Sequence, residues 1–132
     1  MSIRPTQKPP AQATTAQIHH HDAVDIDALI LQRMQTTLGL VGTDQAIATG
    51  YEIILDRLAE MQSLSQSGDM PGIVTRSDAV GALGQAISMI TLTLVAEDVH
   101  TCALRGESAA LSATLARLER VVDRSVMTLW EL

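Results

Sequence analysis

Hydrophobic side chains recur every three or four residues from Asp22 to the end of the chain, and the apolar–polar alternation typical of β-strands is absent. This spacing predicts amphipathic helices throughout. Helix caps and breakers divide the pattern into four of them. The predicted ranges are about 24–41, 43–67, 77–104 and 108–130.

The last predicted helix has the clearest apolar stripe, with the 4-3-4-3-4 spacing typical of coiled-coil packing. Its members are Leu111, Leu115, Leu118, Val122, Ser125 and Leu129. The stripe of the first helix is Ile26, Ile30, Met34, Thr37 and Val41, and that of the second is Ile47, Tyr51, Ile54, Leu58 and Met61. Because Gly39 and Gly42 lie where these two helices meet, a single helix kinked at the glycines fits the pattern equally well.

Residues 68–72, with the sequence Gly-Asp-Met-Pro-Gly, form the clearest predicted loop. Short loops between long helices favour antiparallel neighbours. We therefore predict an all-α, up-down antiparallel four-helix bundle over residues 23–132. Residues 1–22 contain three of the four prolines and show no periodicity, so we predict a disordered N-terminal arm.

Composition excludes several classes of function. Hydrophobic residues make up 46% of the chain and charged residues 18%, which is globular composition. There is no Phe, one Tyr and one Trp, so little is available for stacking on bases. The net charge is −6, and every acidic residue lies from Asp22 onward. Such a domain repels phosphate backbones, so no nucleic-acid partner is expected.

The chain ends and the single cysteine favour a cytoplasmic protein. Cys102 has no partner for an intrachain disulfide, and the first residues lack an apolar run that could act as a signal peptide. Residues 79–96 carry no charge and reach the lower length limit of a membrane span. Because Gln85 and Thr91 interrupt them, we interpret this stretch as a buried central helix and expect no membrane association.

The predicted third helix carries two apolar faces. Leu83, Ile87, Ile90 and Leu94 lie on one, and Leu92, Val95 and Val99 lie towards another. A helix in a four-helix monomer buries one stripe, so the second face needs a second cover. We therefore predict a homodimer, with cover by loops and the N-terminal arm as the alternative.

Two charges fall on apolar faces of the predicted helices. Arg33 lies between Ile30 and Thr37, and Glu97 occupies the position after Leu94 in the third helix. We interpret both as buried-charge candidates and hypothesise an Arg33–Glu97 ion pair, within one subunit or across a dimer.

Glu97 also forms a Glu-x-x-His pair with His100, the ligand pair that helices supply in di-iron and di-manganese bundles. Such a centre needs a second pair and two further Glu residues, so Glu97 and His100 are metal candidates only. The run His19–His21 on the arm suits weak metal binding at most. We predict no cofactor.

Two charged stripes are candidate partner-binding surfaces. Glu52, Asp56 and Glu60 follow one another at four-residue spacing, and Arg117, Arg120 and Arg124 form a basic counterpart on the last helix. Solvated faces are the ordinary explanation, and docking to a charged partner is the functional one.

Residues 104–130 are similar to the last helix of the flagellin-specific export chaperones, which are small acidic helical bundles. The resemblance covers about a fifth of the chain and transfers no site residues. It favours a chaperone or adaptor. No phosphate-binding loop or nucleophile motif is present, and no catalytic residue is predicted. We expect a non-enzymatic adaptor, chaperone or regulatory subunit that binds a protein partner, or alternatively a dimeric bundle that binds a metal or small ligand through Glu97 and His100.

Overall fold

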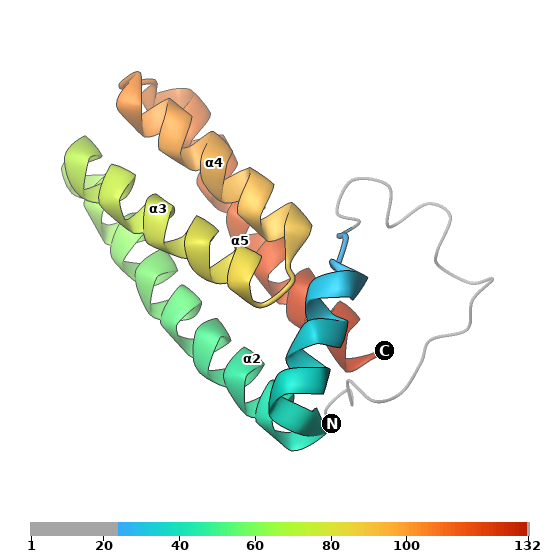
Figure 1. The fold of residues 1–132 in the computed structure, drawn as a ribbon. Coiled ribbons are helices and arrows are strands. Elements are labelled where there is room, and N and C mark those ends of the chain that lie inside the picture. Colours follow the sequence, from blue (N-terminus) through green and yellow to red (C-terminus); the bar gives the residue numbers. More distant parts are fainter. Residues whose placement is uncertain (1–23, 132) are drawn as a thin grey trace, which may run out of the picture.

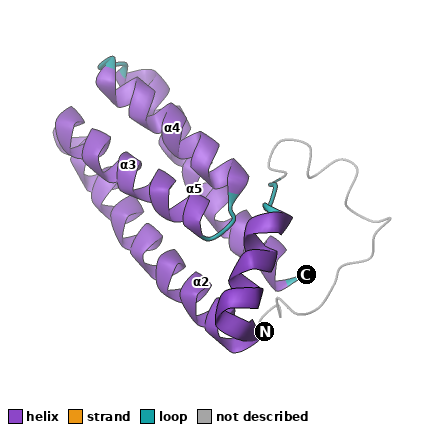
Figure 2. Cartoon of the chain, viewed as in Figure 1, coloured by secondary structure: helices purple, strands orange, loops and turns teal. Residues whose placement is uncertain are grey.

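The structure, a computed structural model, describes residues 24–131, and its regular elements there are helices (Figure 2). They are α2 (Ala28–Ser67), α3 (Met70–Ala86), α4 (Ile90–Leu104) and α5 (Ser108–Trp130). The described residues contain no strand, only one isolated antiparallel bridge between Ile26 and Met89. The all-α prediction is confirmed. The predicted N-terminal arm, residues 1–22, lies outside the described residues.

Successive helices lie side by side and run in opposite directions (Figure 1). The order α2, α3, α4, α5 follows the chain around the bundle, with short turns between the helices. This is the predicted up-down antiparallel four-helix bundle. Its core is almost wholly aliphatic; the largest fully buried side chains include Ile54, Met61, Ile73, Met89, Leu92, Leu111 and Leu118. Within the described part of the chain, no helix has both the length and the apolar character of a membrane span.

α2 consists of two helical segments that meet at a kink at Gly39, close to the boundary that the sequence analysis placed between its first two helices. Gly39 has φ 76° and ψ 175°, a conformation essentially confined to glycine. The Thr43 hydroxyl donates to the Gly39 carbonyl at 2.7 Å and caps the interrupted backbone. We call residues 28–38 the short limb, residues 40–67 the long limb, and residues 38–42 the elbow.

The short limb folds back over one end of the bundle (Figure 1). Asp27 caps its start by accepting from the Leu29 and Ile30 amides. Beside the bridge, the Asp27 amide donates to the Ser88 carbonyl at 2.7 Å. These bonds tie the start of α2 to the turn between α3 and α4.

The prediction of a single third helix is wrong, because this segment forms two antiparallel helices, α3 and α4. The break falls at 87–89, where Ser88 has φ 74° and reverses the chain. Leu92, Val95 and Val99 consequently face the bundle core, whereas Leu94 is exposed. The double apolar face that motivated the homodimer prediction therefore does not exist, although self-association itself is not tested by this finding.

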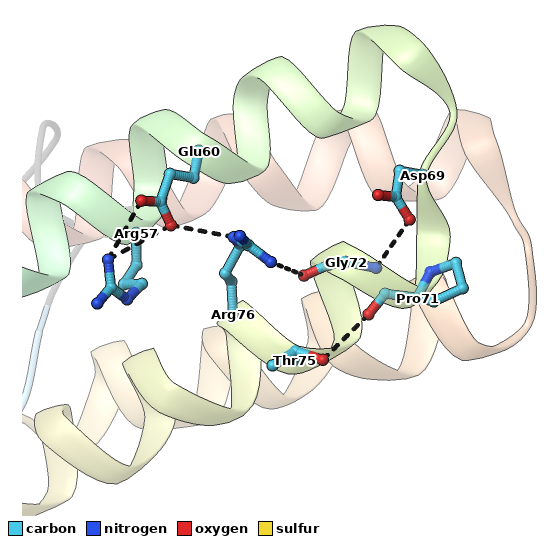
Figure 3. Close-up of polar contacts among 7 residues, drawn as sticks. All are labelled: Arg57, Glu60, Asp69, Pro71, Gly72, Thr75 and Arg76. Atoms are coloured by element: carbon cyan, nitrogen blue, oxygen red, sulfur yellow. Dashed lines mark hydrogen bonds and ion pairs between the residues drawn. The ribbon is translucent and has the colours of Figure 1, made fainter.

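The predicted loop at 68–72 is shorter than expected. Asp69 caps α3 by accepting from the Gly72 amide at 3.0 Å, and Pro71 lies in the first helical turn (Figure 3). Proline fits there because first-turn amides have no intrahelical partner. Only Gly68, with φ 78°, and Asp69 separate α2 from α3.

α3 and α4 approach closely at Gly84. A Cβ at this position would lie 2.7 Å from Leu92 Cδ2 and 2.9 Å from Thr93 Oγ1. At Gly81 the nearest atom, Ala96 Cβ, would be an ordinary 3.8 Å away. Gly84 is thus required for the packing, whereas Gly81 leaves room for a methyl group.

The stripe predicted for α5 is confirmed. Leu111, Leu115, Leu118 and Val122 are buried, and Leu129 is half-buried. Ser125 occupies a fully buried position in the same stripe, and its hydroxyl has no hydrogen-bond partner within residues 24–131.

Candidate partner-binding surfaces

The acidic stripe of α2 is partly neutralised by the chain itself. Glu52 and Asp56 are exposed, but Glu60 is half-buried between two arginines (Figure 3). Its carboxylate lies 3.2 Å from Arg57 Nη1 and 3.0 Å from Arg76 Nε. Glu60 therefore links α2 to α3.

The basic stripe of α5 lies largely on the surface. Arg117 and Arg120 are exposed and Arg124 is half-buried. Arg117 Nη1 lies 3.8 Å from Asp98 Oδ2 of α4, an ion pair between exposed side chains. Such pairs contribute little to stability, so binding a charged partner remains an open role for this stripe.

The buried-charge prediction is wrong for both residues. Arg33 lies on the exposed side of the short limb, and Glu97 is exposed on α4. No ion pair joins them within residues 24–131. The error has a physical cause: the inward stripe of α4 runs through Val95, Ala96 and Val99, so Glu97 falls beside that stripe and not on it.

Glu97 and His100 do share a hollow, of about 260 Å³, between α3 and α4. Asp78 and Gln85 also line it, together with several small residues. However, the described residues include no group of three or more His, Cys, Asp or Glu side chains placed to hold a metal ion. The hollow therefore offers polar contacts for a small ligand more readily than a metal centre.

Ser77, His100 and Asp78 meet at one end of this hollow, but their geometry does not match that of a nucleophilic triad. Asp78 Oδ1 lies 3.3 Å and Ser77 Oγ 3.5 Å from the same imidazole nitrogen, Nδ1. A triad needs the acid on one ring nitrogen and the nucleophile on the other. Ser77 is also buried and donates to the Val74 carbonyl at 3.0 Å. These polar contacts therefore link α3 to α4.

The elbow of α2 carries the most concentrated apolar exposure of the described chain, and the sequence analysis missed it. Leu38, Leu40 and Val41 are 49%, 69% and 71% exposed. Leu40 also borders a hollow of about 330 Å³. The hollow lies between the two limbs of α2 and the end of α5, and its other lining residues are Leu31, Gln35, Thr43, Asp44, Ile47 and Leu129.

A signal for the elbow was present in the sequence. Val41 was placed on the buried stripe of the first helix, yet glycines flank it on both sides. Glycine lowers helix stability and allows a change of direction. An apolar residue between two such positions has no assured place in a core.

Tyr51 is the only tyrosine of the chain and lies half-buried on the long limb. Burial raises the pKa of its hydroxyl above the ordinary value of 10.0, and the negative charge of Asp123 raises it further. Tyr51 belongs to α2 and Asp123 to α5, and these two helices are in contact.

Comparisons with protein-family models, with curated proteins and with solved structures give no match to this chain. The similarity of residues 104–130 to export chaperones therefore stays a prediction.

Proposed function

We propose that the chain is a non-enzymatic protein-interaction module, a cytoplasmic adaptor or chaperone, that binds an aliphatic segment of a protein partner at the elbow of α2. One observation carries this proposal: Leu38, Leu40 and Val41 are exposed together at a single bend. Contiguous apolar patches of this kind on a small protein mark interaction sites.

The hollow beside the elbow strengthens the case. Binding energy at interfaces concentrates where an apolar side chain fills a desolvated pocket. Leu31, Ile47 and Leu129 give the hollow an aliphatic wall, and Asp44 places one carboxylate at its edge. A partner segment with two or three aliphatic side chains and a neighbouring basic residue matches this chemistry.

Site-specific photo-crosslinking in the native cell tests the proposal. A photo-reactive residue at position 40 is expected to capture a defined protein, and the additional change Val41→Asp is expected to abolish the capture. Position 104 is the matched control, because Leu104 is 64% exposed and is the last residue of α4, a helix that ends at the opposite end of the bundle from the elbow (Figure 1). Equal capture at positions 40 and 104, or capture that survives Val41→Asp, would contradict the proposal.

The charged stripes give a second set of contacts for the same partner. Arg117→Glu combined with Arg120→Glu reverses the exposed part of the basic stripe. If the stripe contributes to docking, crosslinking at position 40 falls several-fold at low salt and the difference shrinks at high salt. Unchanged crosslinking would leave these arginines as solvated surface.

A small-ligand role for the hollow between α3 and α4 is the second candidate, since Glu97 and His100 line it together. Elemental analysis of untagged protein, purified without a nickel column, tests the metal form of this idea. Near-stoichiometric iron, manganese or zinc that is lost in Glu97→Gln would support it. Metal-free protein would restrict the hollow to an organic ligand.

A further inference from the structure

The two limbs of α2 carry apolar stripes that do not match in phase. On the short limb, Leu31 and Met34 pack against the core; on the long limb, Thr43, Ile47 and Gly50 are buried. Met34 and Thr43 are nine residues apart, which is about two and a half helical turns. In a straight α2 the two stripes would therefore face opposite sides of the helix.

Gly39 resolves the mismatch within one molecule. Its φ of 76° breaks the helix so that both stripes reach the same core. The bend leaves part of the first stripe uncovered: Leu38 and Val41 follow Met34 at positions i+4 and i+7, yet both are exposed. In the kinked chain, only the first part of this stripe is covered. In a straight helix, all of its side chains would lie on one continuous face.

We infer that α2 straightens at Gly39 and that residues 24–38 exchange between two copies of this chain. In the exchanged dimer, the short limb of each copy occupies the site beside the α3–α4 turn of the other. The bonds between Asp25–Asp27 and Ser88–Thr91 are all kept, but they join different copies. Exchange of an identical element in this way is a low-cost route to a dimer.

A second copy would cover the exposed elbow, because the hinges of the two chains meet in the exchanged dimer. In the exchanged dimer the straightened helices pass each other near residues 38–42. Leu38, Leu40 and Val41 lie at that crossing and would cover their counterparts. The inference goes beyond the proposed function, since the partner here is the chain itself; the exchanged dimer would cover the elbow, so another protein would bind it only in the unexchanged form.

Replacement of Gly39 by alanine tests the inference. Among the described residues, no atom lies within 4 Å of a Cβ added at Gly39, so the effect is conformational and not steric. Each dimer forms from two kinked chains. Alanine destabilises the kinked conformation of both chains relative to the straight helix. We expect the dimer dissociation constant from analytical ultracentrifugation to fall by about 30-fold or more.

Gly68→Ala and Gly106→Ala are matched controls. Both glycines have positive φ, 78° and 66°, and neither has an atom of the described residues within 4 Å of an added Cβ. They end helices at turns that the exchange leaves unchanged. Alanine is strained at these positive-φ positions as well, so both changes should lower stability without changing the dissociation constant.

Disulfide crosslinking distinguishes exchange from simple surface contact. In a Cys102→Ser background, one chain carries Ile26→Cys and a second carries Met89→Cys, because these residues face each other in the bridge. If Met89→Cys does not fold by circular dichroism, Asp25→Cys and Ile90→Cys replace the pair. After the two chains are unfolded and refolded together, we expect a disulfide between them in Gly39→Ala and a much smaller yield with Gly39.

Two outcomes would overturn the inference. One is a folded Gly39→Ala protein whose dissociation constant equals that of the two control variants. The other is a tight dimer that forms no disulfide between the chains, because in such a dimer each short limb stays packed on its own bundle. Partner capture at position 40 is scored separately, so failure of the exchange does not decide the proposed function.

Discussion

Ser125→Ala is expected to stabilise the protein. The Ser125 side chain is fully buried in α5, and its hydroxyl has no hydrogen-bond partner in the described chain. Burying such a group costs about 1–3 kcal/mol in proteins, and alanine is favoured over serine in helices by about 0.5 kcal/mol. Because the substitution removes one small atom, the cavity term is minor. We expect the free energy of unfolding to rise by about 1–2 kcal/mol.

Two serine variants separate the contributions. Ser112→Ala changes an exposed serine of the same helix and measures helix propensity alone. Ser77→Ala removes a buried hydroxyl that does donate, to the Val74 carbonyl, and is expected to destabilise by about 1 kcal/mol. Urea unfolding followed by circular dichroism gives all three values on one scale.

The reasoning would be refuted by a gain at Ser125 no larger than that at Ser112. That result would mean that the Ser125 hydroxyl is satisfied in solution, for instance by a buried water. A net loss of stability would lead to the same conclusion more strongly, because it would show that a bond had been broken.

Three further outcomes follow from the contacts between helices. Gly84→Ala should lower the free energy of unfolding by about 1–3 kcal/mol through overpacking, whereas Gly81→Ala should be neutral or stabilising; urea unfolding compares them. Glu60→Gln should cost at most about 1 kcal/mol, an effect that 1 M salt removes, because its two ion pairs are half-exposed. The tyrosinate absorbance of Tyr51 should titrate above pH 10, and Asp123→Asn should lower the midpoint yet leave it above 10 because burial is the larger cause. Since the unfolded chain ionises this hydroxyl first, stability should fall as the pH rises through 10, and Tyr51→Phe should flatten that fall.

The helices with one clean stripe were predictable from sequence. In α5 and in the long limb of α2, the apolar positions repeat with a single phase, and those positions are the buried ones. The phase change within α2 was also visible, because glycines mark it. Its direction was not, since the bend depends on where the core lies.

The break between α3 and α4 was not predictable from local pattern. Ile87, Ser88 and Met89 contain neither glycine nor proline, and Ser88 adopts a positive φ that serine rarely takes. The Met89 amide donates to the Gly84 carbonyl at 2.8 Å across this turn, and Gly84 lets α3 and α4 approach closely. Once this break is missed, the face assigned to Glu97 is wrong, and the buried pair with Arg33 fails with it.

The bond from the Asp25 amide to the Thr91 hydroxyl joins residues 66 positions apart. The ribosome synthesises the short limb of α2 before it has made the α3–α4 hairpin on which that limb packs. The short limb, which is made before α3 and α4, can therefore complete its contacts only after that hairpin has been synthesised, and until then its apolar side is uncovered. If the limbs exchange as proposed above, chains made side by side on one message would meet in this state, and the yield of exchanged dimer would depend on how densely the message is translated.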